Sequence, residues 1–210
     1  MHTKQSQIVA AGYDEIADAY LHWTSTSTLR LRWLETLSAS LPSCARILDL
    51  GCGAGVPLAP FLADRGHHII GVDGSARQIE LARRNEPRAE FMVADMTTVE
   101  FNPASFDAVT AFYSITHVPR DLHLALLERI YGWLRPGSIF LASLGNDDTP
   151  SWTGEWLGTT MHFSHFDAAT NRLLVEQAGF AVDRAEIIGE EEGAKTVRFL
   201  WVVAHKPTER

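Results

Sequence analysis

A glycine-rich loop at residues 51–55 directly follows a short apolar run at residues 47–50. An apolar run that ends in closely spaced glycines is typical of a buried strand that turns sharply into a helix. Gly51, Gly53 and Gly55 permit positive φ angles and let a ligand approach the bare backbone. The helix that follows presents unpaired N–H groups to a carboxylate or phosphate. The loop therefore predicts an α/β domain with a nucleotide-like ligand at the carboxyl end of this strand.

The spacing of acids and glycines narrows the choice of nucleotide. A second apolar run at 69–72 ends in Asp73, which lies 22 residues after Gly51. This is close to the roughly 20 residues expected before a carboxylate that binds ribose. The dinucleotide fingerprint G-x-G-x-x-G needs a glycine where this chain has Val56, and here the third glycine comes one residue early. With Asp49 in front of the loop, the pattern disfavours an NAD-dependent or nucleotide-sugar Rossmann enzyme and leaves it as an alternative.

The order acid-x-G-x-G-x-G resembles motif I of the class I S-adenosylmethionine (SAM) dependent methyltransferases that act on small molecules. The resemblance implies an α/β fold with a Rossmann-like seven-stranded sheet, mostly parallel with an antiparallel last strand, and with helices on both faces. It also implies SAM as the cofactor, with Asp73 holding both ribose hydroxyls.

A second cofactor contact is implied after an apolar run at 91–93. Asp95 and Met96 resemble the adenine contact of this family, whereas the alternative is an acid that caps a turn. The full set of cofactor residues that we predict is Asp49, Gly51, Cys52, Gly53, Gly55, Asp73, Gly74, Asp95, Met96, Phe112, Tyr13 and Tyr20.

The N-terminal region, residues 7–22, carries apolar side chains at helical spacing, and we expect helical segments that are broken near Gly12. The stretch from Tyr13 to Tyr20 resembles the lid segment that precedes many small-molecule methyltransferase cores. The resemblance places one or both tyrosines over the SAM carboxylate or at the mouth of the substrate site. The alternative, equally supported, is that the two rings pack an N-terminal helix onto the core.

His117 follows an apolar run at 106–113 that predicts the fourth strand of the sheet. Ligands of open α/β sheets bind at the carboxyl ends of the strands, so we expect His117 to face that crevice. In methyltransferases with this pattern a histidine here often lies by the transferred methyl group. A neutral imidazole could there take a proton from an O, N or S nucleophile, which makes His117 the candidate catalytic residue. The alternative is a histidine whose hydrogen bonds hold the loop.

Residues 150–166 are rich in large side chains, and we expect them to form a long irregular loop. Such loops are usually functional, and aromatic side chains mixed with polar ones suit a pocket for a flat or apolar acceptor. We predict substrate contacts from Trp152, Trp156, His162 and His165, with an aromatic cluster under the loop as the alternative. The H-x-x-H pair lacks an evident third ligand. The acids at 147–148 resemble those of metal-dependent methyltransferases, but this chain has no acid after the fourth strand, which those enzymes also need. We therefore predict no metal site.

Two helix starts and the C-terminal hairpin complete the expected elements. Ser75 and Gln78 form a capping-box pattern, and Asp167 is expected to cap the last helix. Apolar runs at 181–188 and 197–204 predict two closing strands.

The size and composition fit one domain, because 210 residues of which 46% are hydrophobic can enclose a full α/β core. We expect a single methyltransferase domain over 1–210. Its parts are a helical lid segment at 1–42, a SAM-binding core at 46–145, and a substrate loop with closing helix and hairpin at 146–210.

The formal net charge of −8 disfavours a nucleic-acid or anionic membrane surface, which needs clustered Lys and Arg. We expect a small-molecule methyl acceptor and no nucleic-acid or membrane partner. The chain has two cysteines, no evident leader, and no apolar run near the roughly 20 residues needed to cross a bilayer. These features favour a cytoplasmic protein.

The function that these observations predict is transfer of the SAM methyl group to a small aromatic or apolar molecule by direct in-line displacement. Positioning and desolvation of the acceptor provide much of the acceleration in such a reaction. A non-catalytic SAM-binding protein is the main alternative, because SAM motifs indicate binding more strongly than turnover. The acceptor, the methylated element (O, N, S or C) and the oligomeric state stay open.

Overall fold

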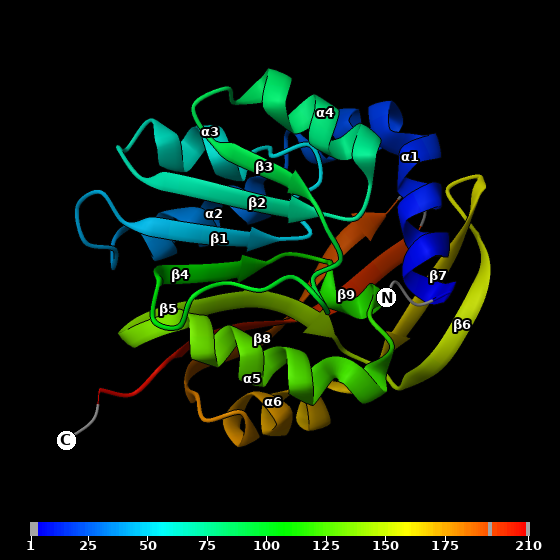
Figure 1. The fold of residues 1–210 in the computed structure, drawn as a ribbon. Helices are drawn as coiled ribbons and strands as arrows, with labels where there is room; N and C mark the ends of the chain where they lie inside the picture. The colour runs from blue at the N-terminus through cyan, green and yellow to red at the C-terminus, as the bar shows by residue number, and fades with distance from the viewer. Residues whose placement is uncertain (1–3, 193–194, 209–210) are drawn as a thin grey trace.

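Seven strands form one twisted sheet in the computed structural model, which describes residues 4–192 and 195–208 (Figure 1). The strands are β1 (Arg46–Leu50), β2 (His68–Asp73), β3 (Glu90–Val93), β4 (Phe106–Ala111), β5 (Leu134–Gly145), β8 (Ala181–Glu192) and β9 (Lys195–His205). They lie in the order β3-β2-β1-β4-β5-β9-β8. The strands from β3 to β5 pair in parallel, whereas β9 is antiparallel to both β5 and β8. The predicted fold class is confirmed.

Helices cover both faces of this sheet (Figure 1). They are α1 (Lys4–Thr24), α2 (Thr28–Ser38), α3 (Leu58–Ala63), α4 (Ala76–Asn85), α5 (His123–Trp133) and α6 (Ala168–Gln177), with short 3-10 helices η1 (Ile115–His117) and η2 (Arg120–Leu122). One core joins α5 and α6 to the sheet through side chains such as Leu126 and Val175. The other joins α2, α3 and α4 through Leu34, Leu62 and Ile79. The parallel strands are thus buried on both sides, which explains why their apolar runs are continuous.

Local sequence signals set the helix starts and the hairpin as expected. The Ser75 hydroxyl accepts a hydrogen bond from the Gln78 backbone N–H at 3.0 Å, and the Asp167 carboxylate accepts one from the Thr170 N–H at 2.7 Å. These bonds confirm Ser75 and Asp167 as N-caps. The other half of the predicted capping box is wrong, because the Ser75 N–H donates to Asp73 and the Gln78 side-chain amide has no hydrogen-bond partner among the described residues. The closing strands β8 and β9 are confirmed and run beyond their predicted ends.

The prediction of an irregular loop at 150–166 is wrong, because this segment is a β-hairpin. Strands β6 (Thr149–Trp156) and β7 (Thr159–His165) pair in an antiparallel arrangement. Leu157 and Gly158, with φ angles of 52° and 83°, form the two-residue connection. Left-handed conformations at both positions match the twist of a tight hairpin. Leu157 is an unusual residue at such a turn, so no clear hairpin signal is present in the sequence.

The predicted break near Gly12 is also wrong, since α1 runs without interruption through this residue. A side-chain Cβ at Gly12 would lie 2.8 Å from the carbonyl oxygen of Thr160 on β7. Gly12 therefore serves close packing between helix and hairpin, rather than a change in chain direction. Figure 1 shows α1 and the hairpin β6–β7 at the end of the sheet to which the parallel strands point.

Candidate functional site

A cavity of about 400 Å³ lies at the carboxyl ends of β1 to β4, under α1. Its volume falls within the range of roughly 300–1,000 Å³ that small-molecule sites occupy. Its walls include most of the residues predicted to bind the cofactor, namely Gly51, Gly53, Asp73, Gly74, Asp95, Met96, Phe112, Tyr13 and Tyr20. His117 and Ser114 line the same cavity.

The glycine loop forms the floor of this cavity. Gly51 has a φ of +72°, and a Cβ there would lie 2.2 Å from the Cβ of Ser114. The Gly51 and Cys52 N–H groups both donate to the carbonyl of Val72, at 2.8 and 3.0 Å, which holds the loop against β2. Backbone is thus exposed to the cavity where any side chain would clash.

Asp73 is oriented by two backbone donors. Its Oδ2 accepts from the Gly53 N–H at 2.8 Å and its Oδ1 accepts from the Ser75 N–H at 2.9 Å. Burial raises the pKa of this carboxyl above its ordinary value, while the two backbone bonds lower it. A carboxylate has about four acceptor positions, so each Asp73 oxygen retains capacity for a hydroxyl of a ribose in the cavity.

Three of the predicted cofactor residues shape the loop from beneath and do not line the cavity. The Asp49 carboxyl is buried and accepts from the Thr110 hydroxyl at 2.7 Å, and burial raises its pKa to about 7. Cys52 is buried as a free thiol. A Cβ at Gly55 would lie 3.1 Å from the ring of Phe91, so this glycine lets β3 approach the loop. The sequence alone does not distinguish whether these three residues support the loop or contact a ligand.

Asp95 follows β3 and faces the cavity. Its Oδ1 accepts from both the backbone N–H and the hydroxyl of Thr97, at 2.9 and 2.7 Å. The residue thus caps a turn and also lines the cavity beside Met96. The two alternatives that the sequence offered for Asp95 are compatible with each other.

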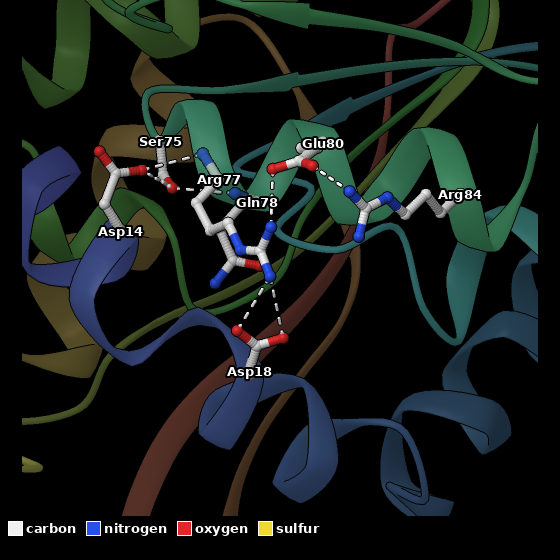
Figure 2. Close-up of polar contacts among 7 residues, drawn as sticks. All are labelled: Asp14, Asp18, Ser75, Arg77, Gln78, Glu80 and Arg84. Carbon is white, nitrogen blue, oxygen red and sulfur yellow. Dashed lines mark hydrogen bonds and ion pairs between the residues drawn. The ribbon is translucent and has the colours of Figure 1, made fainter.

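Helix α1 closes the cavity and is fastened to the start of α4 (Figure 2). The Asp14 carboxylate accepts from the Ser75 hydroxyl at 2.5 Å and from the Arg77 backbone N–H at 2.9 Å. One turn later, Asp18 pairs with the Arg77 guanidinium at 3.1 Å. Arg77 also pairs with Glu80 at 2.7 Å. A carboxylate at the amino terminus of α4 is favoured by the helix dipole, so these contacts hold α1 against the start of α4.

A second cavity, of about 520 Å³, adjoins the first. Four residues line both: Tyr13, Tyr20, Tyr113 and His117. The second cavity is enclosed by α1, α2, the hairpins and aromatic side chains that include Trp156 and Phe163. The sequence analysis missed its charged residues, Arg30, Glu190 and Glu191, because they lie on elements distant in the chain from any motif.

His117 lies at the junction of the cavities with a defined tautomer. Its Nδ1 lies 2.7 Å from the carbonyl oxygen of His162, which can only accept, so Nδ1 carries the proton. Its Nε2 is therefore the acceptor for the Tyr13 hydroxyl, at 2.9 Å. Burial lowers the pKa of His117 to about 4. The imidazole is neutral at pH 7 with its proton-free nitrogen toward Tyr13.

The predicted substrate residues separate into two groups. Trp156 lines the second cavity, whereas Trp152, His162 and His165 line neither of the two cavities. The Trp152 ring lies against Phe163 and is 42% exposed. His162 contacts the Thr153 hydroxyl at 2.9 Å through Nδ1, and His165 contacts the Asp147 carbonyl at 2.8 Å. Strand residues alternate between faces, so His162 points away from its neighbour Phe163, which lines the second cavity. Trp152 shares the face of Trp156 and Phe163 but lies four residues farther from the turn than Trp156.

Over the described residues, no group of three or more His, Cys, Asp or Glu side chains is arranged to hold a metal ion. No helix within 4–192 or 195–208 is long and apolar enough to span a membrane.

The exposed glycine backbone, the doubly oriented acid after β2 and the acid after β3 fit a nucleoside with a charged tail. The sheet order matches the Rossmann-like fold of the class I SAM-dependent methyltransferases. Residues 47–137 match the family model described as "Methyltransferase domain". The predicted resemblance to SAM-dependent methyltransferases is confirmed, and SAM is the cofactor of this family.

Individual methyltransferases, and one cyclase, are similar to this chain in sequence or in structure. The chain is 36% identical over 147 residues to a demethylmenaquinone methyltransferase of Clavibacter sepedonicus, which covers 64% of this chain and 57% of that protein. A structure of the 1,6-didemethyltoxoflavin-N1-methyltransferase of Burkholderia thailandensis with S-adenosylhomocysteine (SAH) covers 99% of this chain and 92% of its own, with a TM-score of 0.74 and 22% identity. The cyclase SpnF reaches a TM-score of 0.74 at 17% identity, over 97% of both chains. The chain spans less than two thirds of the length of the curated relatives it matches.

Proposed function

We propose that this chain transfers the methyl group of SAM to a small aromatic or apolar molecule by direct in-line displacement. The observation that carries the proposal is the junction of two cavities at Tyr13, Tyr20, Tyr113 and His117. One cavity has the groups for a nucleoside, and the other has aromatic walls that suit a planar acceptor. SAM, when bound, supplies an electrophilic methyl group on its sulfonium.

In this proposal the residues of the first cavity hold and orient the cofactor. Asp73 accepts from the ribose hydroxyls, and Asp95 with Met96 contacts the adenine. The backbone of Gly51 and Gly53 lies against the amino-acid tail of the cofactor, where a side chain would clash. Tyr13 and Tyr20 contribute from α1, so the lid is part of the cofactor site.

The proposed role of His117 is to hold or accept a proton at Nε2. Its tautomer is set by the His162 carbonyl, and its neutral state follows from burial. An acceptor hydroxyl or amine that replaces the Tyr13 hydroxyl would meet an unprotonated nitrogen. Since a pKa of about 4 makes a weak base, the main contribution is orientation of the nucleophile through its hydrogen bond.

The charge, the cysteines and the order of the segments support further parts of this proposal. The net charge of −8 supports a small molecule rather than nucleic acid as acceptor. Both cysteines are free, which supports a reducing, cytoplasmic location. The division into lid segment 1–42, core 46–145 and substrate segment 146–210 is supported by the positions of α1 and the two hairpins around the site.

Methyl transfer is tested by incubating the protein with methyl-labelled SAM and a panel of aromatic hydroxyl, amine and thiol compounds. We expect label in an acceptor product together with equimolar SAH. His117→Ala is expected to lower the rate of transfer while SAH affinity is retained. SAH binding without turnover across the panel would contradict the proposed activity. This control is necessary because a cyclase shares the fold.

A further inference from the structure

The second cavity contains a group of charged and aromatic side chains to which no role has been given. Arg30 comes from α2, Tyr113 follows β4, and Glu190 lies on β8. These three positions are up to 160 residues apart in the chain. Tyr113 lines the cavity and adopts a φ of +57°, which is uncommon for a residue other than glycine.

The guanidinium of Arg30 is half-buried and lies over an aromatic face. Its Cζ is 4.7 Å from the centroid of the Tyr113 ring, and its Nη2 donates to the Tyr20 hydroxyl at 3.4 Å. Among residues 4–192 and 195–208, no carboxylate oxygen forms an ion pair with Arg30 within 4.0 Å. Most of its five N–H donors therefore remain available to a ligand.

Glu190, the acid of this group, forms a hydrogen bond with another partner. The Tyr113 hydroxyl donates to its carboxylate in a short hydrogen bond. Tyr113 thus lies between the two charges: its ring supports the guanidinium and its hydroxyl holds the carboxylate. Glu190 and the two tyrosines favour the charge of Arg30, but no carboxylate of the described residues lies within ion-pairing distance of it, so a ligand carboxylate could form the direct pair.

The remaining walls indicate what else such a ligand carries. Trp156 and Phe163 line the same cavity, with ring centroids 5.7 Å apart. From Arg30 the path to His117 passes Tyr20 and Tyr13, whose centroids lie 5.1 Å apart. A flat ring with an anionic oxygen at one end would contact Arg30 and present its other end to the junction.

We propose that Arg30 is the specificity-determining residue of the acceptor cavity, and that it selects an aromatic acceptor bearing a carboxylate. The guanidinium geometry suits a carboxylate, which can accept two parallel N–H bonds. The inference rests on the proposed function, since it assigns the second cavity to the acceptor. Tyr113 is a positioning residue that supports the guanidinium through its ring.

The test measures binding to the SAH-loaded protein by calorimetry with two matched pairs of probes. The pairs are 4-hydroxybenzoate with 4-hydroxybenzamide, and indole-3-acetate with indole-3-acetamide. We expect the acid of at least one pair to bind about 10-fold or more tightly than its neutral amide. This preference should weaken as salt is raised, because it depends on charge.

Variants of Arg30 and Glu190 should affect this preference differently. Arg30→Gln should abolish the preference for the acid without changing SAH affinity, because Arg30 does not line the first cavity. Glu190→Gln removes a negative charge and keeps an acceptor for the Tyr113 hydroxyl, so it should preserve or increase the preference. Arg30→Lys retains the charge, and should keep part of the preference even if Arg30→Gln fails to fold.

Several results would overturn the inference. They are equal binding of acid and amide, absence of binding by either acid, or a preference that survives in Arg30→Gln. A loss of SAH affinity in Arg30→Gln as large as the loss for the acid would assign the guanidinium to the cofactor instead. Failure of the wild-type protein to bind SAH would refute the proposed function itself, so the two failures are distinct.

Discussion

Removal of the Asp14 carboxylate should loosen the lid and weaken cofactor binding. In Asp14→Ala, α1 loses the bonds to the Ser75 hydroxyl and the Arg77 backbone N–H. Net contributions are about 0.5–1.5 kcal/mol for each hydrogen bond, and the charge at the α4 amino terminus adds about 0.3–1 kcal/mol. Because Asp14 is exposed, the lower part of these ranges applies. The docked helix should lose about 1–2 kcal/mol.

The consequence for affinity follows from the residues that α1 contributes to the cavity wall, among them Tyr13 and Tyr20. If SAH binds only beneath the docked helix, a loss of 1–2 kcal/mol weakens binding by up to about 5–30-fold. Asp18→Ala is the matched control on the same helix. It loses only an ion pair whose carboxylate is 73% exposed, which is worth about 0–1 kcal/mol.

Calorimetric titration with SAH compares the two variants with the wild type, and amide hydrogen exchange over residues 4–24 reports docking of the helix. We expect Asp14→Ala to weaken SAH binding and speed exchange in α1, and Asp18→Ala to change both only slightly. Unchanged SAH affinity in Asp14→Ala, or equal losses in both variants, would refute the reasoning.

Three further predictions address the loop, the helix contact and the histidine. Gly51→Ala should lower the melting temperature and abolish SAH binding, because its Cβ would meet Ser114 at 2.2 Å and its φ is +72°; normal SAH binding would show that the loop yields. Gly12→Val should separate α1 from the Thr160 carbonyl, measured as faster proteolysis of α1, and wild-type proteolysis would contradict the close packing. Burial lowers the pKa of His117 from 6.5 to about 4, so the unfolded chain binds more protons between these values and stability is lost as pH falls. Urea denaturation at pH 7 and pH 4 should show wild type losing up to about 3 kcal/mol more than His117→Gln, whereas parallel pH profiles would argue against a buried neutral imidazole.

The residues of the first cavity could be predicted because their signals are local. Gly51 and the apolar strand before it are adjacent in sequence, and the sheet brings Asp73 next to them through one β-α-β unit. The carboxyl ends of the predicted parallel strands also indicated which edge of the sheet carries the cavity. The sequence does not show which residues of the motif line the cavity and which support the loop. Asp49 and Gly55 belong to the same motif as Gly51, yet they lie on the interior side of the loop.

The second cavity could not be predicted because its residues meet only in three dimensions. Arg30, Tyr113 and Glu190 belong to no motif, and each is unremarkable among its sequence neighbours. At 150–166 composition indicated aromatic side chains correctly, but it could not show where the hairpin lies relative to α1. Trp152 and Trp156 share one face of β6 and both contact Phe163. Only Trp156, beside the turn and against Tyr13 and Tyr20 of α1, lines the cavity.

The most direct test of this account is calorimetric titration of the wild-type protein and Asp73→Ala with SAH, with NADH as the control ligand. The account predicts micromolar SAH binding by the wild type, no response to NADH, and at least about 10-fold weaker SAH binding by Asp73→Ala, because two hydrogen bonds to a carboxylate are lost. Equal SAH affinity of both proteins, or preferential binding of NADH, would contradict the assignment of the first cavity to SAM.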